Sequence, residues 1–126
     1  MERNIRYACN IAKHEDSKLA LIHVISEPTV ISPDLGAFPM KTFEDIGRSI
    51  LENAKTIAKS MGVEADTILE RCYGNPAQKI IQVAEDGKFD LITISSREHS
   101  RLHNVLLGTV CDTVTRHAPC PVLVVR

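Results

Sequence analysis

The feature that most constrains the fold of this chain is a strict alternation of helix-like and strand-like segments. Stretches in which apolar residues recur at helical spacing alternate with short apolar runs rich in branched side chains. In chain order, the pattern predicts helix 2–13, strand 19–25, helix 42–61, strand 65–72, helix 76–86, strand 90–94, helix 109–117 and strand 122–125.

Short polar residues, glycine and proline mark several ends of these segments. Asn75 followed by Pro76 predicts a helix start, because asparagine caps the free N–H groups and proline fits the first turn. Thr42 has an acidic residue three positions later and predicts the start of the preceding helix. Gly62 and Gly87 follow apolar periodic stretches and predict helix ends.

The alternation predicts an α/β fold made of one domain, residues 1–126. Parallel strands need helical crossovers, which place helices on both faces of an open, twisted, Rossmann-like sheet. Ligands of such sheets bind beyond the carboxyl ends of the strands. We therefore expect the functional residues in the loops that follow the strands.

Charge and hydropathy exclude several function classes. The chain has 15 Lys and Arg against 16 Asp and Glu, a formal net charge of −1, and no basic stripe for nucleic acid. It has no apolar run long enough to span a membrane and no signal-like segment, so we expect a cytoplasmic protein without membrane contact. None of its cysteines forms a C-x-x-C pair, which favours buried reduced thiols over a metal site. They are Cys9, Cys72, Cys111 and Cys120.

The loop "SSREHSRLHNVLLGT", residues 95–109, follows the third predicted strand and leads into a helix. Gly108 and Thr109 open that helix, where free N–H groups and the helix dipole favour an anion. Ser95, Ser96 and Arg97 offer further donors for phosphate oxygens. Ordinary helix capping and turn formation are the alternative reading of the same residues.

The last third of the chain, "DLITISSREHSRLHNVLLGTVCDTVTRHAPCPVLVVR", resembles the universal stress protein family. In that family a strand is followed by G-x-x-G-x9-G-[ST], a helix and a closing "HAPCPVLVV". The segments "LALIHVI" and "GNPAQKIIQVAEDGKFDLI" resemble its second strand and its third helix with the fourth strand. The resemblance covers nearly the whole chain and implies an adenine-nucleotide pocket and a homodimer.

Two departures from the family pattern bear on function. The family's first strand, of the type "ILVAVDGS", is absent, and this leaves a slot between the strands at 19–25 and 90–94. We favour a shortened start or a strand upstream of residue 1, with a rearranged sheet or another segment in the slot as alternatives. In the loop, Ser95 and Glu98 replace two glycines, and a glutamate repels phosphate unless it turns outward.

The resemblance implies a ligand site and an interface. ATP or AMP is the expected ligand, with Mg²⁺ only where ATP is bound. The dimer forms through the last strand, because its apolar edge is free to pair with a twin. The candidate nucleotide-binding residues are Val24, Ser95, Ser96, Arg97, Gly108, Thr109 and Val110, and the candidate interface residues are Val122, Leu123, Val124 and Val125.

The favoured function is a dimeric binding or signalling module of the stress response with a degenerate nucleotide pocket. A nucleotide-binding protein with weak ATP hydrolysis is the first alternative, and a dimerisation scaffold without ligand is the second. No G-x-S-x-G nucleophile motif and no Walker lysine motif occurs, so a catalytic role is the weaker reading, and no catalytic residue is assigned.

Overall fold

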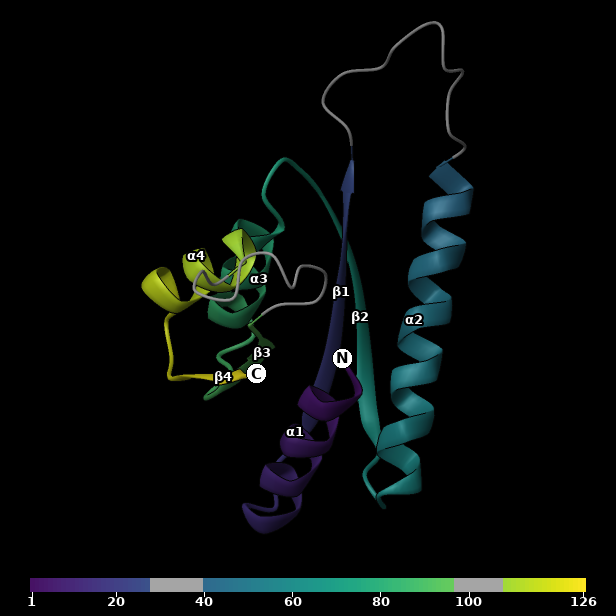
Figure 1. The fold of residues 1–126 in the computed structure, drawn as a ribbon, viewed down its shortest axis with the longest axis vertical. Coiled ribbons are helices and arrows are strands. Elements are labelled where there is room, and N and C mark those ends of the chain that lie inside the picture. Colours follow the sequence, from purple (N-terminus) through teal and green to yellow (C-terminus); the bar gives the residue numbers. More distant parts are fainter. Residues whose placement is uncertain (28–39, 97–107) are drawn as a thin grey trace, which may run out of the picture.

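The computed structural model describes residues 1–27, 40–96 and 108–126 and has the predicted alternation of helices and parallel strands (Figure 1). Its elements in chain order are α1 Glu2–His14, β1 Leu19–Glu27, α2 Met40–Ser60, β2 Ala65–Tyr73, α3 Pro76–Asp86, β3 Ile92–Ser95, α4 Thr109–His117 and β4 Val122–Val125. No helix among the described residues is long and apolar enough to cross a bilayer.

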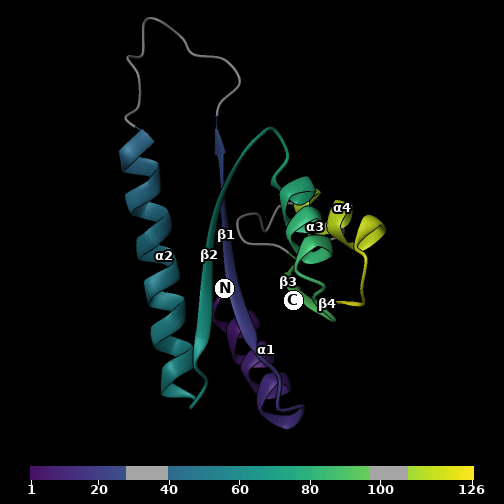
Figure 2. The same ribbon diagram turned by 180° about the vertical axis from the view of Figure 1, so that it is seen from behind.

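The strands form two separate parallel pairs, whereas the sequence predicts one open sheet. β1 pairs with β2 from Leu19 opposite Ala65 onward, and β3 pairs with β4 from Ile92 opposite Val122 onward. Within the described ranges β1 and β3 are not hydrogen-bonded neighbours, and both views show the two pairs apart (Figures 1 and 2). The single sheet is interrupted because no described strand lies between β1 and β3 to bond both.

Helix α2 covers one face of the β1–β2 pair, and α1 packs against α2 and the start of the same pair (Figure 2). The core at this end combines small side chains, which let the helices approach closely, with a few larger apolar ones. It consists of Ile5, Cys9, Ala54, Ala58, Val63 and Ala65. Helices α3 and α4 pack against each other beside the β3–β4 pair.

The predicted helix ends are confirmed except at Thr42. Asn75 caps α3, with its Oδ1 accepting from the N–H of Ala77 at 3.0 Å. Gly62 has φ of 81°, the left-handed conformation that glycine adopts at low cost. Helix α2 begins at Met40, so Thr42 lies inside its first turn, and the interpretation of Thr42 as the cap is wrong. Met40 and Lys41 are good helix formers. Their helix propensity outweighs the capping preference of Thr42, so the helix begins two residues earlier than predicted.

Candidate functional site

The candidate site lies where β3 ends and α4 begins. The N–H of Ser96 donates to the Val125 carbonyl of β4 at 2.9 Å, which extends the strand pairing by one residue beyond Ser95. The Ser96 carbonyl then accepts a hydrogen bond from the N–H of Gly108 at 3.0 Å. The end of β3 and the start of α4 therefore lie next to each other.

The amino end of α4 has no side-chain cap among the residues that the structure describes. Gly108 is the N-cap residue, and its carbonyl accepts the N–H of Asp112 at 2.9 Å. The N–H groups of the first turn, including those of Thr109 and Val110, have no partner within the helix. Thr109 is exposed, and Gly108 and Val110 are half-buried, so within the described residues this end of the helix is accessible to an anion.

Gly108 does not have the conformation that the glycine-rich family loop suggests. Its φ of −59° and ψ of 153° are open to any residue, so a left-handed turn is not what requires glycine here. A Cβ on Gly108 would lie 3.4 Å from the Ser96 carbonyl oxygen, which is an ordinary van der Waals contact. Neither the backbone conformation nor packing against the described residues therefore requires glycine at this position.

A side-chain connection from α3 fixes the first turn of α4. The Nδ2 of Asn75 donates to Oγ1 of Thr113 at 3.3 Å, while that hydroxyl donates to the Thr109 carbonyl at 2.9 Å. Asn75 therefore caps α3 and also holds α4. Sequence reasoning identified only the capping role, because a contact across 38 positions has no local signal.

The structure brings together five of the seven candidate nucleotide-binding residues: Ser95, Ser96, Gly108, Thr109 and Val110. Val24 lies on β1, opposite Glu70 of β2, in the other strand pair. Arg97 lies outside the described residues, as do Glu98 and the rest of the loop. The candidate interface residues form β4, in which Val125 is 7% exposed and the other three are half-buried.

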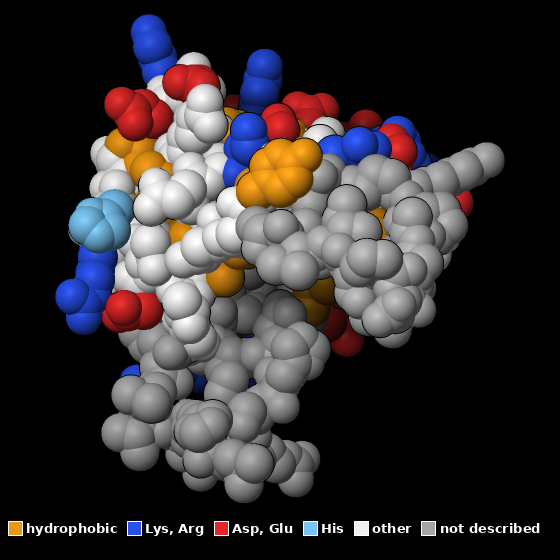
Figure 3. Space-filling view, turned by 90° about the horizontal axis from the view of Figure 1, so that it is seen from above, with side chains coloured by type: hydrophobic (Ala, Val, Ile, Leu, Met, Phe, Trp, Pro, Cys, Tyr) orange, Lys and Arg blue, Asp and Glu red, His pale blue; other side chains and the backbone are white. Residues whose placement is uncertain are grey.

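The charges near the site are of both signs. Asp112, in the first turn of α4, pairs with Arg116 at 3.2 Å. Figure 3 looks onto the end of the molecule at which β1 ends, and the described part of that face mixes basic and acidic side chains. The described part of this face therefore shows no concentration of one sign of charge.

Two cysteine thiols, one on α4 and one between α4 and β4, have a pKa above the usual value for cysteine. Burial raises the pKa of the Cys111 thiol, although a hydrogen bond from Thr115 lowers it in part. Burial and the Asp90 carboxylate raise the pKa of Cys120. Within the described ranges no group of three His, Cys, Asp or Glu is arranged to hold a metal ion.

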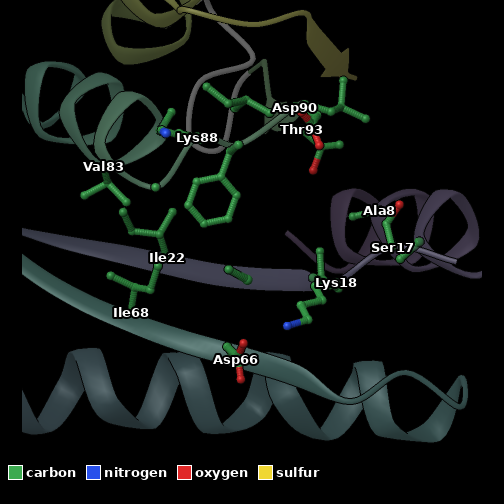
Figure 4. Close-up of a pocket in the computed structure, with 18 of the residues that line it drawn as sticks. Ala8, Ser17, Lys18, Ile22, Asp66, Ile68, Val83, Lys88, Asp90 and Thr93 are labelled. Carbon is green, nitrogen blue, oxygen red and sulfur yellow. The ribbon is translucent and has the colours of Figure 1, made fainter. Parts of the chain in front are cut away.

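A cavity of about 730 Å³ lies away from the candidate site, between the two strand pairs (Figure 4). Residues of β1 and β2, such as Ile22 and Ile68, line one side, and Thr93 of β3 lies on the other. Helices α1 and α3 contribute Ala8 and Val83. Neither Gly108 nor Thr109 lines this cavity, so it is distinct from the helix end described above.

Comparison with known proteins identifies the family to which this chain belongs. The model of the universal stress protein family matches residues 2–126. A universal stress protein of Methanocaldococcus jannaschii is 35% identical over 124 residues, which cover 96% of this chain and 72% of that protein. The chain therefore belongs to the universal stress protein family.

Solved structures agree on the fold. A universal stress protein from Archaeoglobus fulgidus superposes with a TM-score of 0.83 at 21% identity, covering 99% of this chain and 88% of that one. An Archaeoglobus fulgidus universal stress protein in complex with dAMP gives a TM-score of 0.72 at 19% identity, covering 99% and 86%. Two further family structures of similar fold hold cAMP and AMP.

Proposed function

We propose that this protein is a stress-response binding module that holds an adenine nucleotide weakly at the amino end of α4. The observation that carries the proposal is the first turn of α4, which no side chain of the described residues caps, beside the Ser96–Gly108 hydrogen bond. Free N–H groups at that end suit a phosphate, and the Thr109 hydroxyl adds a donor. The nucleotide complexes of structurally similar family members support the choice of ligand.

The proposed pocket consists of Ser95, Ser96, Arg97, Gly108, Thr109 and Val110, with Val24 on the side of the β1–β2 pair. We take it to be degenerate for two reasons. Ser95 and Glu98 stand where the family pattern has glycines, and glutamate disfavours a nearby phosphate. Val24 lies in the β1–β2 pair and the other residues lie beside the β3–β4 pair, and within the described residues these two pairs are not hydrogen-bonded to each other.

The proposed assembly is a homodimer through β4. The N–H of Ser96 donates to the Val125 carbonyl and that of Ile92 to the Pro121 carbonyl. Alternate residues of β4 therefore face β3, and the main-chain groups of Val122 and Val124 face the other edge. No described strand pairs with that edge, so it is available to the same strand of a second copy.

Isothermal titration calorimetry with AMP and with ATP plus Mg²⁺ tests the nucleotide proposal. We expect dissociation constants of about 1 mM, corresponding to only about 4 kcal/mol of binding free energy. Gly108→Glu places a carboxylate at the helix end and is expected to abolish the signal, whereas Asn53→Glu, at an exposed position of α2, is a control with the same change of charge away from the site. Micromolar affinity would contradict a degenerate pocket, and equal binding by Gly108→Glu would place the nucleotide elsewhere.

A further inference from the structure

The edge of β2 that faces away from β1 has no strand beside it among the described residues. All nine residues of β2 pair in parallel with β1, and β2 lies on the side of β1 that is away from the β3–β4 pair (Figures 1 and 2). Main-chain N–H and C=O groups of a strand turn alternately to its two sides. This edge therefore presents a row of hydrogen-bonding groups to which a further strand can pair.

A groove of about 480 Å³ lies beside this edge, between β2 and α2. Its floor is apolar and consists of Leu51, which is 6% exposed, and Leu69, which is half-buried. Thr67 and Arg71 also line the groove, because they lie on the same face of β2 as Leu69. The described lining comes from α2 and β2 and includes no residue of β1. The groove therefore follows the outer flank of the sheet, where an added strand would lie.

One end of the groove has a surplus of positive charge. The Glu44 carboxylate accepts hydrogen bonds from Nη2 of Arg48 and from Nη2 of Arg71, each at 2.8 Å and each at a different oxygen. Two guanidinium groups, one from α2 and one from β2, therefore share a single carboxylate. The side chains of Arg48 and Arg71 are 65% and 44% exposed, so their other N–H groups are accessible to a second carboxylate.

The other end of the groove is acidic. Glu52 lines the groove about two helical turns after Glu44 on α2 and has no basic partner among the described residues. Because α2 runs antiparallel to β2, Glu52 lies toward the start of β2, on the side of Thr67 (Figure 1). Thr67 and Arg71 are four residues apart, so the acidic and basic ends of the groove are about 13 Å apart.

We propose that the free edge of β2 binds an extended segment of a partner polypeptide in which an acidic, an apolar and a basic residue occupy every second position. Three such residues face one side of a strand and span about 13 Å, which matches the groove. The acidic side chain lies beside Arg48 and Arg71, and the basic one lies beside Glu52. The apolar side chain packs between them, over Leu51 and Leu69. Main-chain hydrogen bonds supply the affinity, and the charges fix the register.

A second copy of β2 does not supply this pattern. The side chain of Leu69 lies against Gly47 of α2, so every second residue of β2 faces that helix. None of these residues is acidic: Ala65, Thr67, Leu69, Arg71 and Tyr73. A paired copy would therefore place no carboxylate of this face beside the two arginines. The occupant is a different polypeptide, and its site is separate from the nucleotide site at α4.

The test uses the 126-residue chain and a blocked synthetic peptide in which glutamate, valine and lysine alternate with threonine. Binding with a dissociation constant below about 1 mM is expected. Hydrogen exchange of alternate β2 amides, those that face away from β1, is expected to slow at least about tenfold at saturation, while the amides of β3 and β4 change little. A matched peptide with two successive central prolines lacks N–H groups on both of its sides and is expected not to bind.

A charge reversal tests the register. Arg71→Glu is expected to weaken binding of the glutamate peptide at least about tenfold. A peptide with lysine in place of the glutamate is expected to bind this variant more tightly than it binds the wild type, and such a gain requires a folded edge. Lys13→Glu, at an exposed position of α1, is the same charge reversal away from the groove and should leave binding unchanged.

Several results would overturn the proposal. They are no binding at about 1 mM peptide, binding without protection of β2, equal binding of the proline peptide, and equal affinity of the wild type and Arg71→Glu for the glutamate peptide. Protection of alternate β2 amides in the chain without peptide would also overturn it, because the chain itself or a second copy would then occupy the edge.

Discussion

Gly108 is expected to matter more for ligand binding than for the stability of the fold. Its backbone dihedrals suit any residue, so Gly108→Ala is expected to change the free energy of unfolding by no more than about 0.5 kcal/mol. The new Cβ would lie 3.4 Å from the Ser96 carbonyl oxygen and narrow the approach to the α4 amino end. AMP binding, followed by NMR, is therefore expected to weaken severalfold, with Gly62→Ala as the contrasting variant.

Gly62 has positive φ and open space around it, so alanine there is expected to destabilise the fold without reducing AMP binding. Chemical denaturation separates the two effects. A large loss of stability in Gly108→Ala would show that this glycine serves the fold instead of the ligand.

The buried thiols at Cys9 and Cys111 predict a loss of stability at alkaline pH. Burial raises the pKa of both thiols in the folded chain above that of an exposed cysteine, so the protonated form is favoured by folding. The resulting stabilisation is complete below the unfolded pKa of about 8.5 and is lost as the pH rises through the folded value.

Urea denaturation between about pH 7 and pH 10 measures this effect. We expect the pH dependence to become shallower in a Cys9→Ala, Cys111→Ala double variant. Cys72→Ala is the control, because this thiol is only half-buried. An unchanged slope in the double variant would contradict the burial of these thiols.

At the scale of elements, the start of α3 determines how α4 is held. Asn75→Ala removes both the cap of α3 and the hydrogen bond to Thr113, and we expect it to cost about 1 kcal/mol or more in unfolding free energy. Asn75→Asp keeps the capping oxygen but loses the donor to Thr113. It should fold nearly as stably as the wild type while loosening the first turn of α4.

Hydrogen exchange of the Thr113 and Val114 amides reports this loosening. Faster exchange in both variants, with a stability loss only in Asn75→Ala, is the expected result. Equal stability of the wild type, Asn75→Ala and Asn75→Asp would show that the cap contributes little to the free energy of unfolding.

At the scale of the whole molecule, the free edge of β4 predicts a dimer that a single charge disrupts. Val124 presents its main-chain groups to that edge, and Val124→Glu introduces like charges across a twofold axis. Sedimentation equilibrium is expected to show a dimer for the wild type and a monomer for Val124→Glu. Val124→Thr keeps the branched shape and should remain dimeric, whereas a monomeric wild type would contradict the proposed assembly.

The sequence was sufficient to predict element order and type, because amphipathic periodicity, Asn75 and Gly62 are local signals. It did not predict the exact start of α2, since helix propensity at Met40 outweighed the capping signal of Thr42. It also predicted a group of site residues around Gly108, five of which the fold brings together. The second role of Asn75 and the ion pair of Glu44 with Arg71 depend on contacts between distant segments, which no local pattern records.

An amide NMR titration of the chain with AMP tests directly whether the amino end of α4 binds a nucleotide weakly. We expect chemical-shift changes centred on Ser96, Gly108, Thr109 and Val110 that saturate only at about millimolar AMP. Saturation at micromolar AMP, or shifts centred instead on Ile22 and Ile92 in the cavity between the strand pairs, would contradict this expectation.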